Sequence, residues 1–81
     1  MLAIHCDTPT VEVYRTTVTS RLAADVLLGQ LHWFFPGWVI SFDLEDCDRV
    51  LRVETNGDPV PGDFIAGLLA QRGYQCVPLP D

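Results

Sequence analysis

Residues 38–54 read WVISFDLEDCDRVLRVE, two alternating runs separated by an acidic turn. In the first run Ile40 and Phe42 fall on one face and polar side chains on the other, and in the second run Leu51 and Val53 repeat that spacing. Successive side chains of a strand point to opposite faces of a sheet, so both runs are typical of strands with one buried face. The stretch therefore predicts a β-hairpin whose turn is the Asp-Cys-Asp sequence.

A helical pattern precedes the hairpin. Residues 20–35 read SRLAADVLLGQLHWFF, in which apolar residues recur every three or four positions. The residues expected to face the core are Ala23, Leu27, Leu31 and Phe34. Thr19 or Ser20 can cap the start of the helix, and Pro36-Gly37 ends it.

A second helix and two further strands complete the pattern. Residues 63–72, DFIAGLLAQR, predict a helix that buries Ile65, Leu68 and Leu69 and ends at Gly73. β-branched residues dominate VEVYRTTV at 11–18, which predicts a strand. YQCVPL at 74–79 predicts a short last strand, and its proline favours a sheet edge.

The expected order is therefore β-α-β-β-α-β. The simplest packing of that order is an α+β ferredoxin-like two-layer sandwich, with a four-stranded antiparallel sheet and both helices on one face. We expect residues 10–81 to form this single domain and residues 1–9 to be an N-terminal tail.

Composition narrows the classes of partner. The 81 residues carry 11 acidic and 5 basic side chains, a formal net charge of -6. That charge disfavours nucleic acid and membrane surfaces, and no segment reaches the roughly 20 apolar residues of a membrane span. The three cysteines are odd in number and widely spaced, which does not indicate a disulfide framework. We expect a reduced, cytoplasmic protein.

Three places in the chain carry a resemblance to a known family. Residues 17–23, TVTSRLA, occupy the position of a Gly-Met-Thr-Cys-x-x-Cys loop, Pro36-Gly37 follows the first helix, and Gly73-Tyr74 follows the second. Over roughly residues 11–79 the chain resembles the heavy-metal-associated domain of copper chaperones and metal-pumping ATPases. The resemblance implies the same ferredoxin-like fold and places Ser20 and Ala23 at the two metal-binding cysteines.

The chain departs from the family at those two positions. Two thiolates three residues apart hold Cu(I) or Zn(II) in the family, whereas serine is a poor ligand for soft metals and alanine is none. The family's metal binding is therefore not carried over to this chain. Arg15 is a second departure, because it stands where alternation in the first strand favours an apolar residue, and a bulge or a register shift is one explanation.

Other residues are of types that can bind a metal or take part in catalysis. Cys47 in the hairpin turn and Cys76 in the last strand are expected at the same end of the sheet, but the strand order 4-1-3-2 separates their strands by about 14 Å. The carboxylates of residues 43–48 lack the spacing of a calcium loop. His5-Cys6 lies on the tail, and His32 stands alone near a helix end. We expect no catalytic residue, no cofactor and no bound metal, with Cys47 and Cys76 as the alternative.

The first predicted helix carries more apolar surface than one small sheet can cover. At 100° per residue, three apolar residues share a face away from the core stripe, and they are Leu22, Val26 and Trp33. Leu28 and Phe35 line the opposite flank, and Trp38 follows shortly after. Apolar patches of this kind mark interfaces, and tryptophan is a common hot-spot residue.

These observations favour a non-catalytic interaction module that binds a protein partner, with self-association as the simplest case. One alternative is a soft-metal binding or trafficking protein that uses Cys47 and Cys76. A second alternative is a small-molecule regulatory domain, a function that other ferredoxin-like folds perform.

Overall fold

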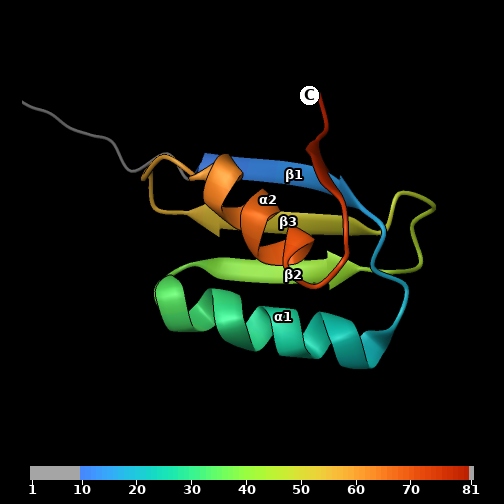
Figure 1. Ribbon diagram of the computed structural model, residues 1–81. Helices are drawn as coiled ribbons and strands as arrows, with labels where there is room; N and C mark the ends of the chain where they lie inside the picture. Colours follow the sequence, from blue (N-terminus) through green and yellow to red (C-terminus); the bar gives the residue numbers. More distant parts are fainter. Residues whose placement is uncertain (1–9, 81) are drawn as a thin grey trace, which may run out of the picture.

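The computed structural model describes residues 10–80 of the chain (Figure 1). Its elements in chain order are β1 (Thr10–Thr16), α1 (Arg21–Phe34), β2 (Val39–Asp43), β3 (Val50–Thr55), α2 (Gly62–Ala70) and β4 (Cys76–Pro78). The predicted order of helices and strands is therefore confirmed. The prediction of a tail at residues 1–9 lies outside the described residues.

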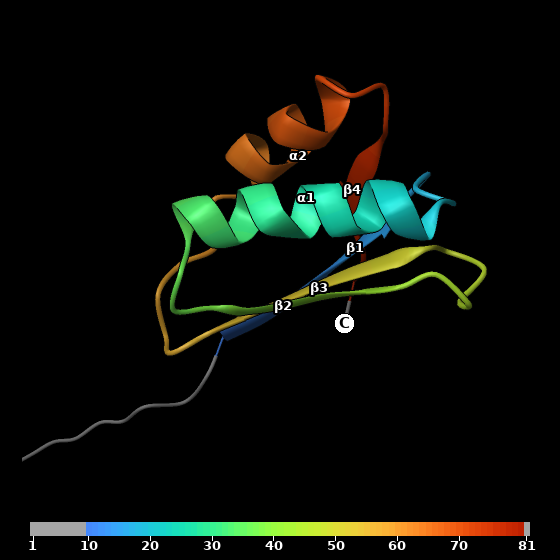
Figure 2. The same ribbon diagram turned by 90° about the horizontal axis from the view of Figure 1, so that it is seen from below.

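The four strands form one antiparallel sheet in the order β2-β3-β1-β4. Both helices lie on the same side of this sheet (Figure 2). The architecture is the α+β ferredoxin-like sandwich that the sequence predicts. β2 and β4 are the two edge strands, as the strand order 4-1-3-2 requires.

The core lies between the sheet and the helices. The alternation in residues 38–54 predicts its sheet side correctly, because Ile40, Phe42, Leu51 and Val53 are all buried. On the helix side, Leu27 and Leu31 of α1 and Ile65 and Leu69 of α2 are fully buried. The second helix therefore buries the stripe expected of it, with Leu68 partly buried at its margin.

The buried face of α1 is rotated slightly from the predicted stripe. Ala24 is fully buried, whereas Ala23 is only partly buried. Phe34 was expected in the core but is 49% exposed. Its ring packs edge-on against Phe64 of α2, with ring centroids 5.0 Å apart, instead of against the sheet. The prediction that Phe34 is a core residue is therefore wrong.

The alternation of β1 has the opposite phase to the one expected. Tyr14 and Thr16 are buried beneath the helices, and Arg15 points away from them and is exposed. β1 pairs with β3 residue for residue from Thr10↔Thr55 to Tyr14↔Leu51, without a bulge. Arg15 thus occupies an outward position of a regular strand. The sequence did not show which side chains of this strand point inward, because β-branched residues occur on both of its faces.

The second helix ends at Ala70, two residues before the end of the predicted helix, and a turn over residues 71–73 follows it. Gly73 has φ +86°, a left-handed conformation that favours glycine. The Tyr74 amide then donates to the Leu69 carbonyl oxygen at 3.0 Å. β4 is shorter than the predicted strand at 74–79, although the Leu79 amide still donates to the Val13 carbonyl oxygen at 2.8 Å. Pro78 fits this edge position because an edge strand tolerates a residue without an amide hydrogen.

Candidate interaction surface

The outer face of α1 is apolar and exposed. Trp33 is 80% exposed, Leu22 75% and Val26 42%. These three residues, which we call the α1 outer face, are spaced four and seven positions apart, so they lie along one line of the helix. Exposed apolar side chains are common singly, but several on one side of a helix are typical of a binding surface.

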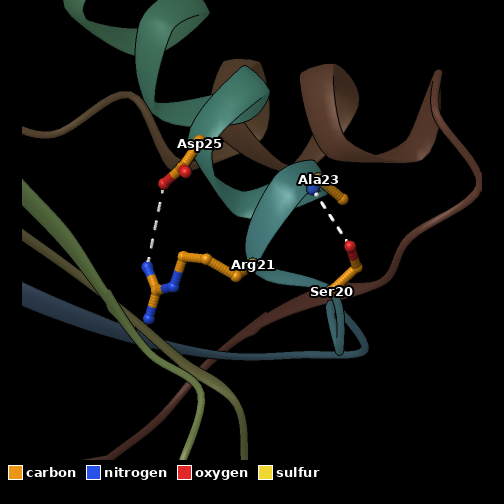
Figure 3. A network of polar contacts seen from close by, with 4 residues as sticks. All are labelled: Ser20, Arg21, Ala23 and Asp25. Carbon is orange, nitrogen blue, oxygen red and sulfur yellow. Dashed lines mark hydrogen bonds and ion pairs between the residues drawn. The ribbon is translucent and has the colours of Figure 1, made fainter.

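Polar contacts hold the first turns of this helix in place. The Ser20 hydroxyl accepts a hydrogen bond from the Ala23 amide at 3.3 Å and caps the helix (Figure 3). One turn further, the Arg21 guanidinium lies 3.9 Å from the Asp25 carboxylate, an exposed i,i+4 pair. Ser20 and Ala23 therefore lie at the start of a helix and offer no pair of metal ligands.

A hollow of about 480 Å³ adjoins the α1 outer face. It lies between the start of α1 and the end of α2, and the side chains that line it are Ser20, Leu22, Ala23, Val26, Gln71, Arg72 and Tyr74. At its margin the Arg72 Nε donates to the Gln30 Oε1 at 3.2 Å, which ties the end of α2 to α1. The hollow thus lies beside Leu22 and Val26 but has a mixed lining, because Gln71 and Arg72 add polar groups from the end of α2.

Aromatic rings extend the surface at the other end of α1. Phe34 and Phe64 are 49% and 43% exposed. The ring of Phe64 also packs edge-on against Phe35, with centroids 5.8 Å apart. Sequence reasoning missed this cluster because it assigned Phe34 to the core and did not consider Phe64. The available signal was a large apolar residue, Phe64, outside the stripe that this helix was expected to bury.

The remaining predicted interface residues lie against the core. Leu28, Phe35 and Trp38 are partly buried and pack against the buried cluster. The rings of Phe35 and Trp38 stack, with centroids 4.3 Å apart and an interplanar angle of 4°. The structure therefore separates Trp33, which faces solvent, from Trp38, which has a neighbour within the domain.

The two described cysteines lie on opposite sides of β1. Cys76 pairs across the sheet with Thr16. From the other side, the Thr16 amide donates to the carbonyl oxygen of Asp48, the residue after Cys47, at 3.0 Å. Cys76 packs against the core as a small apolar residue, and burial raises the pKa of its thiol to about 11. The raised pKa makes the thiolate, which is the form that binds metals, harder to generate at this position than at an exposed cysteine.

Asp46, Cys47 and Asp48 bring their ligand atoms within 4.8 Å of one another in the hairpin turn. The Asp46 carboxylate accepts a hydrogen bond from the Asp48 amide at 2.9 Å, so part of this cluster already stabilises the turn.

His32 is exposed in the last turn of α1, a place that favours a cation. His5-Cys6 lies outside the described residues.

Comparison of the chain with protein-family models, with curated proteins and with solved structures gives no match. Within residues 10–80, no helix has the length and apolar character that crossing a bilayer requires.

Proposed function

We propose that this domain is a non-catalytic interaction module that associates with a second copy of itself through the α1 outer face. The single observation that carries the proposal is that Trp33, with four-fifths of its surface exposed, lies in line with Leu22 and Val26. Removing a tryptophan from water is worth several times more than removing a small side chain, so such a position favours association.

Charge supports a second copy as the occupant. The chain has a net charge of -6, which opposes association of its acidic surfaces. α1 carries one acidic residue, Asp25, and pairs it with Arg21. Two copies that meet along α1 therefore bring together a helix whose single acidic side chain is balanced by a basic one. A two-fold axis places the same face on both partners, so one apolar line is sufficient.

The resemblance to the heavy-metal-associated domain is compatible with this proposal, because the chain resembles that domain in fold but lacks its metal-binding loop. We infer that the interaction role replaces metal transfer, because Ser20 caps a helix and Ala23 offers no ligand atom. A cytoplasmic location remains our prediction for such a module.

Sedimentation velocity over a range of protein concentrations tests the proposal. We expect the wild type to associate reversibly and Trp33→Asp to weaken that association. His32→Asp is the matched control, since it adds the same charge one residue away on another face of the helix. Equal association of wild type and Trp33→Asp would refute the role of the α1 outer face.

A further inference from the structure

The face of the sheet opposite the helices carries a second exposed apolar surface. On this side the strands point five valines outward, which are Val11, Val13, Val39, Val50 and Val77. Val39 is 60% exposed, Val77 41% and Val11 38%. No helix of the described chain covers this side (Figure 2). We call these five residues the valine face.

Valines at these positions are unusual for a sheet face that meets water. An antiparallel sheet with one wet face alternates apolar residues inward with polar residues outward. β2 follows that rule at Ser41 and Asp43 but breaks it at Val39. Every strand contributes at least one valine to the outward side, so the surface spans the whole width of the sheet.

The charged groups among the valines balance. On this side of the sheet lie two arginines, Arg15 and Arg52, and two carboxylates, Asp43 and Glu54. Arg52 donates to the Glu54 carboxylate at 3.1 Å. Arg15 forms no ion pair with any residue in the range 10–80. The face thus has no net charge on a strongly acidic chain, and it holds one arginine that a partner's carboxylate can pair.

We propose that the valine face is a second self-association surface, on which the sheet of another copy packs face to face. A half-turn about an axis parallel to the strands exchanges the β2–β3 side of the sheet with the β1–β4 side. That rotation carries Asp43 of one copy toward Arg15 of the other, twice by symmetry. Sheets packed in this way lie about 10 Å apart, a gap that valine side chains from both copies fill.

This inference goes beyond the proposed function, because it needs no contact through α1. The helices and the valine face lie on opposite sides of the sheet (Figure 2), so one copy can use both surfaces at once. Two separate two-fold contacts on one domain produce assemblies larger than a dimer. We therefore expect wild-type protein to pass beyond the dimer as its concentration rises.

Val39→Lys in the valine face and Trp33→Asp in the α1 outer face separate the two contacts. Val39→Lys places a charge in the valine face beside its cross-strand neighbour Glu54, which keeps the lysine tolerable in the folded monomer. Burying that charge against a second sheet weakens this contact roughly tenfold or more. Asn56→Lys, in the exposed loop after β3, is the control with the same change of charge. Val39→Thr, which keeps the β-branched shape, is the milder variant if the lysine disturbs folding.

Sedimentation equilibrium of wild type, Asn56→Lys, Val39→Lys, Val39→Thr, Trp33→Asp and the double variant decides between the outcomes. We expect assemblies beyond the dimer for wild type and Asn56→Lys, dimers for Val39→Lys, and monomers for Val39→Lys combined with Trp33→Asp. An unchanged size of Val39→Lys and Val39→Thr, with Trp33→Asp reduced, overturns the valine face and leaves the proposed function intact. If Val39→Lys reduces the size and Trp33→Asp does not, the α1 outer face is overturned and the valine face is supported. A monomeric wild type at every concentration overturns both.

Discussion

Thr16 and Arg49, 33 residues apart in the chain, are joined by a hydrogen bond from the Thr16 hydroxyl to the Arg49 carbonyl oxygen at 2.5 Å. The same hydroxyl oxygen accepts the Val18 amide at 3.2 Å. Thr16 is buried, and its own amide donates to the Asp48 carbonyl oxygen. One side chain therefore connects the end of β1, the hairpin turn and the approach to α1.

We expect Thr16→Val to destabilise the domain by about 1–3 kcal/mol, because it removes a partner from the half-buried Arg49 carbonyl and from the buried Val18 amide while keeping the side-chain volume. Thr16→Ser retains the hydroxyl and should cost less than Thr16→Val. Urea unfolding followed by circular dichroism measures both. A Thr16→Val protein as stable as wild type would show that these two hydrogen bonds contribute nothing.

Arg49 combines a strained backbone with useful side-chain bonds. Its φ is 47°, and its guanidinium donates to the carbonyl oxygens of Leu44 and Asp46, both at 3.2 Å. Arg49→Gly and Arg49→Ala both lose these bonds, but only glycine is free of strain at this φ. We expect the glycine variant to be more stable than the alanine variant by about 1 kcal/mol in urea unfolding. The opposite order would contradict the left-handed conformation of the turn.

Replacement by alanine should raise the stability of the domain at one glycine and lower it at another. Gly67 lies in the middle of α2, and an added Cβ meets nothing within 4 Å, so Gly67→Ala should stabilise the domain by roughly 0.5–1 kcal/mol. Gly73 is equally open, but its φ of +86° makes Gly73→Ala unfavourable by about 1 kcal/mol. Thermal unfolding of the pair checks both. If both substitutions change stability in the same direction, the left-handed conformation of Gly73 is contradicted.

Burial of Cys76 makes stability depend on alkaline pH. Its pKa rises from an ordinary 9.0 to about 11 in the folded state. Between these values the folded chain binds more protons than the unfolded chain, so stability falls as pH rises through this window. The pKa of Tyr14 is also raised, by burial and then by Glu12 and Cys76, and acts in the same direction. Cys76→Ala should flatten the loss of stability measured by urea unfolding from pH 9 to 11. An unchanged slope would contradict the burial of this thiol.

Much of the fold could be predicted from short-range pattern. Alternation at Ile40, Phe42, Leu51 and Val53 identified the hairpin because polar residues separate the apolar ones. β1 gave no such contrast, since valine and threonine both suit a strand and either face is compatible with VEVYRTTV. Its phase depends on the hydrogen bonds of Thr16 with residues far away in the chain. No local pattern contains that information.

The candidate surfaces were predictable to different degrees. Helical geometry alone located the α1 outer face, because Leu22, Val26 and Trp33 fall away from the core at 100° per residue. The exposed rings of Phe34 and Phe64 depend on how two helices pack, which periodicity within one helix does not specify. The valine face depends on the phase of β1, and the alternation expected at Arg15 is opposite to the one the structure has.

The most direct test of the central claim uses the two tryptophans. Trp38→Phe leaves Trp33 as the single tryptophan and keeps an aromatic ring stacked on Phe35. We predict that the emission maximum of this variant lies at short wavelength in concentrated solution, where a second copy covers Trp33, and moves to long wavelength on dilution. An emission maximum of a fully hydrated tryptophan at every concentration, in samples whose mass rises with concentration, would contradict the claim that α1 is where two copies meet.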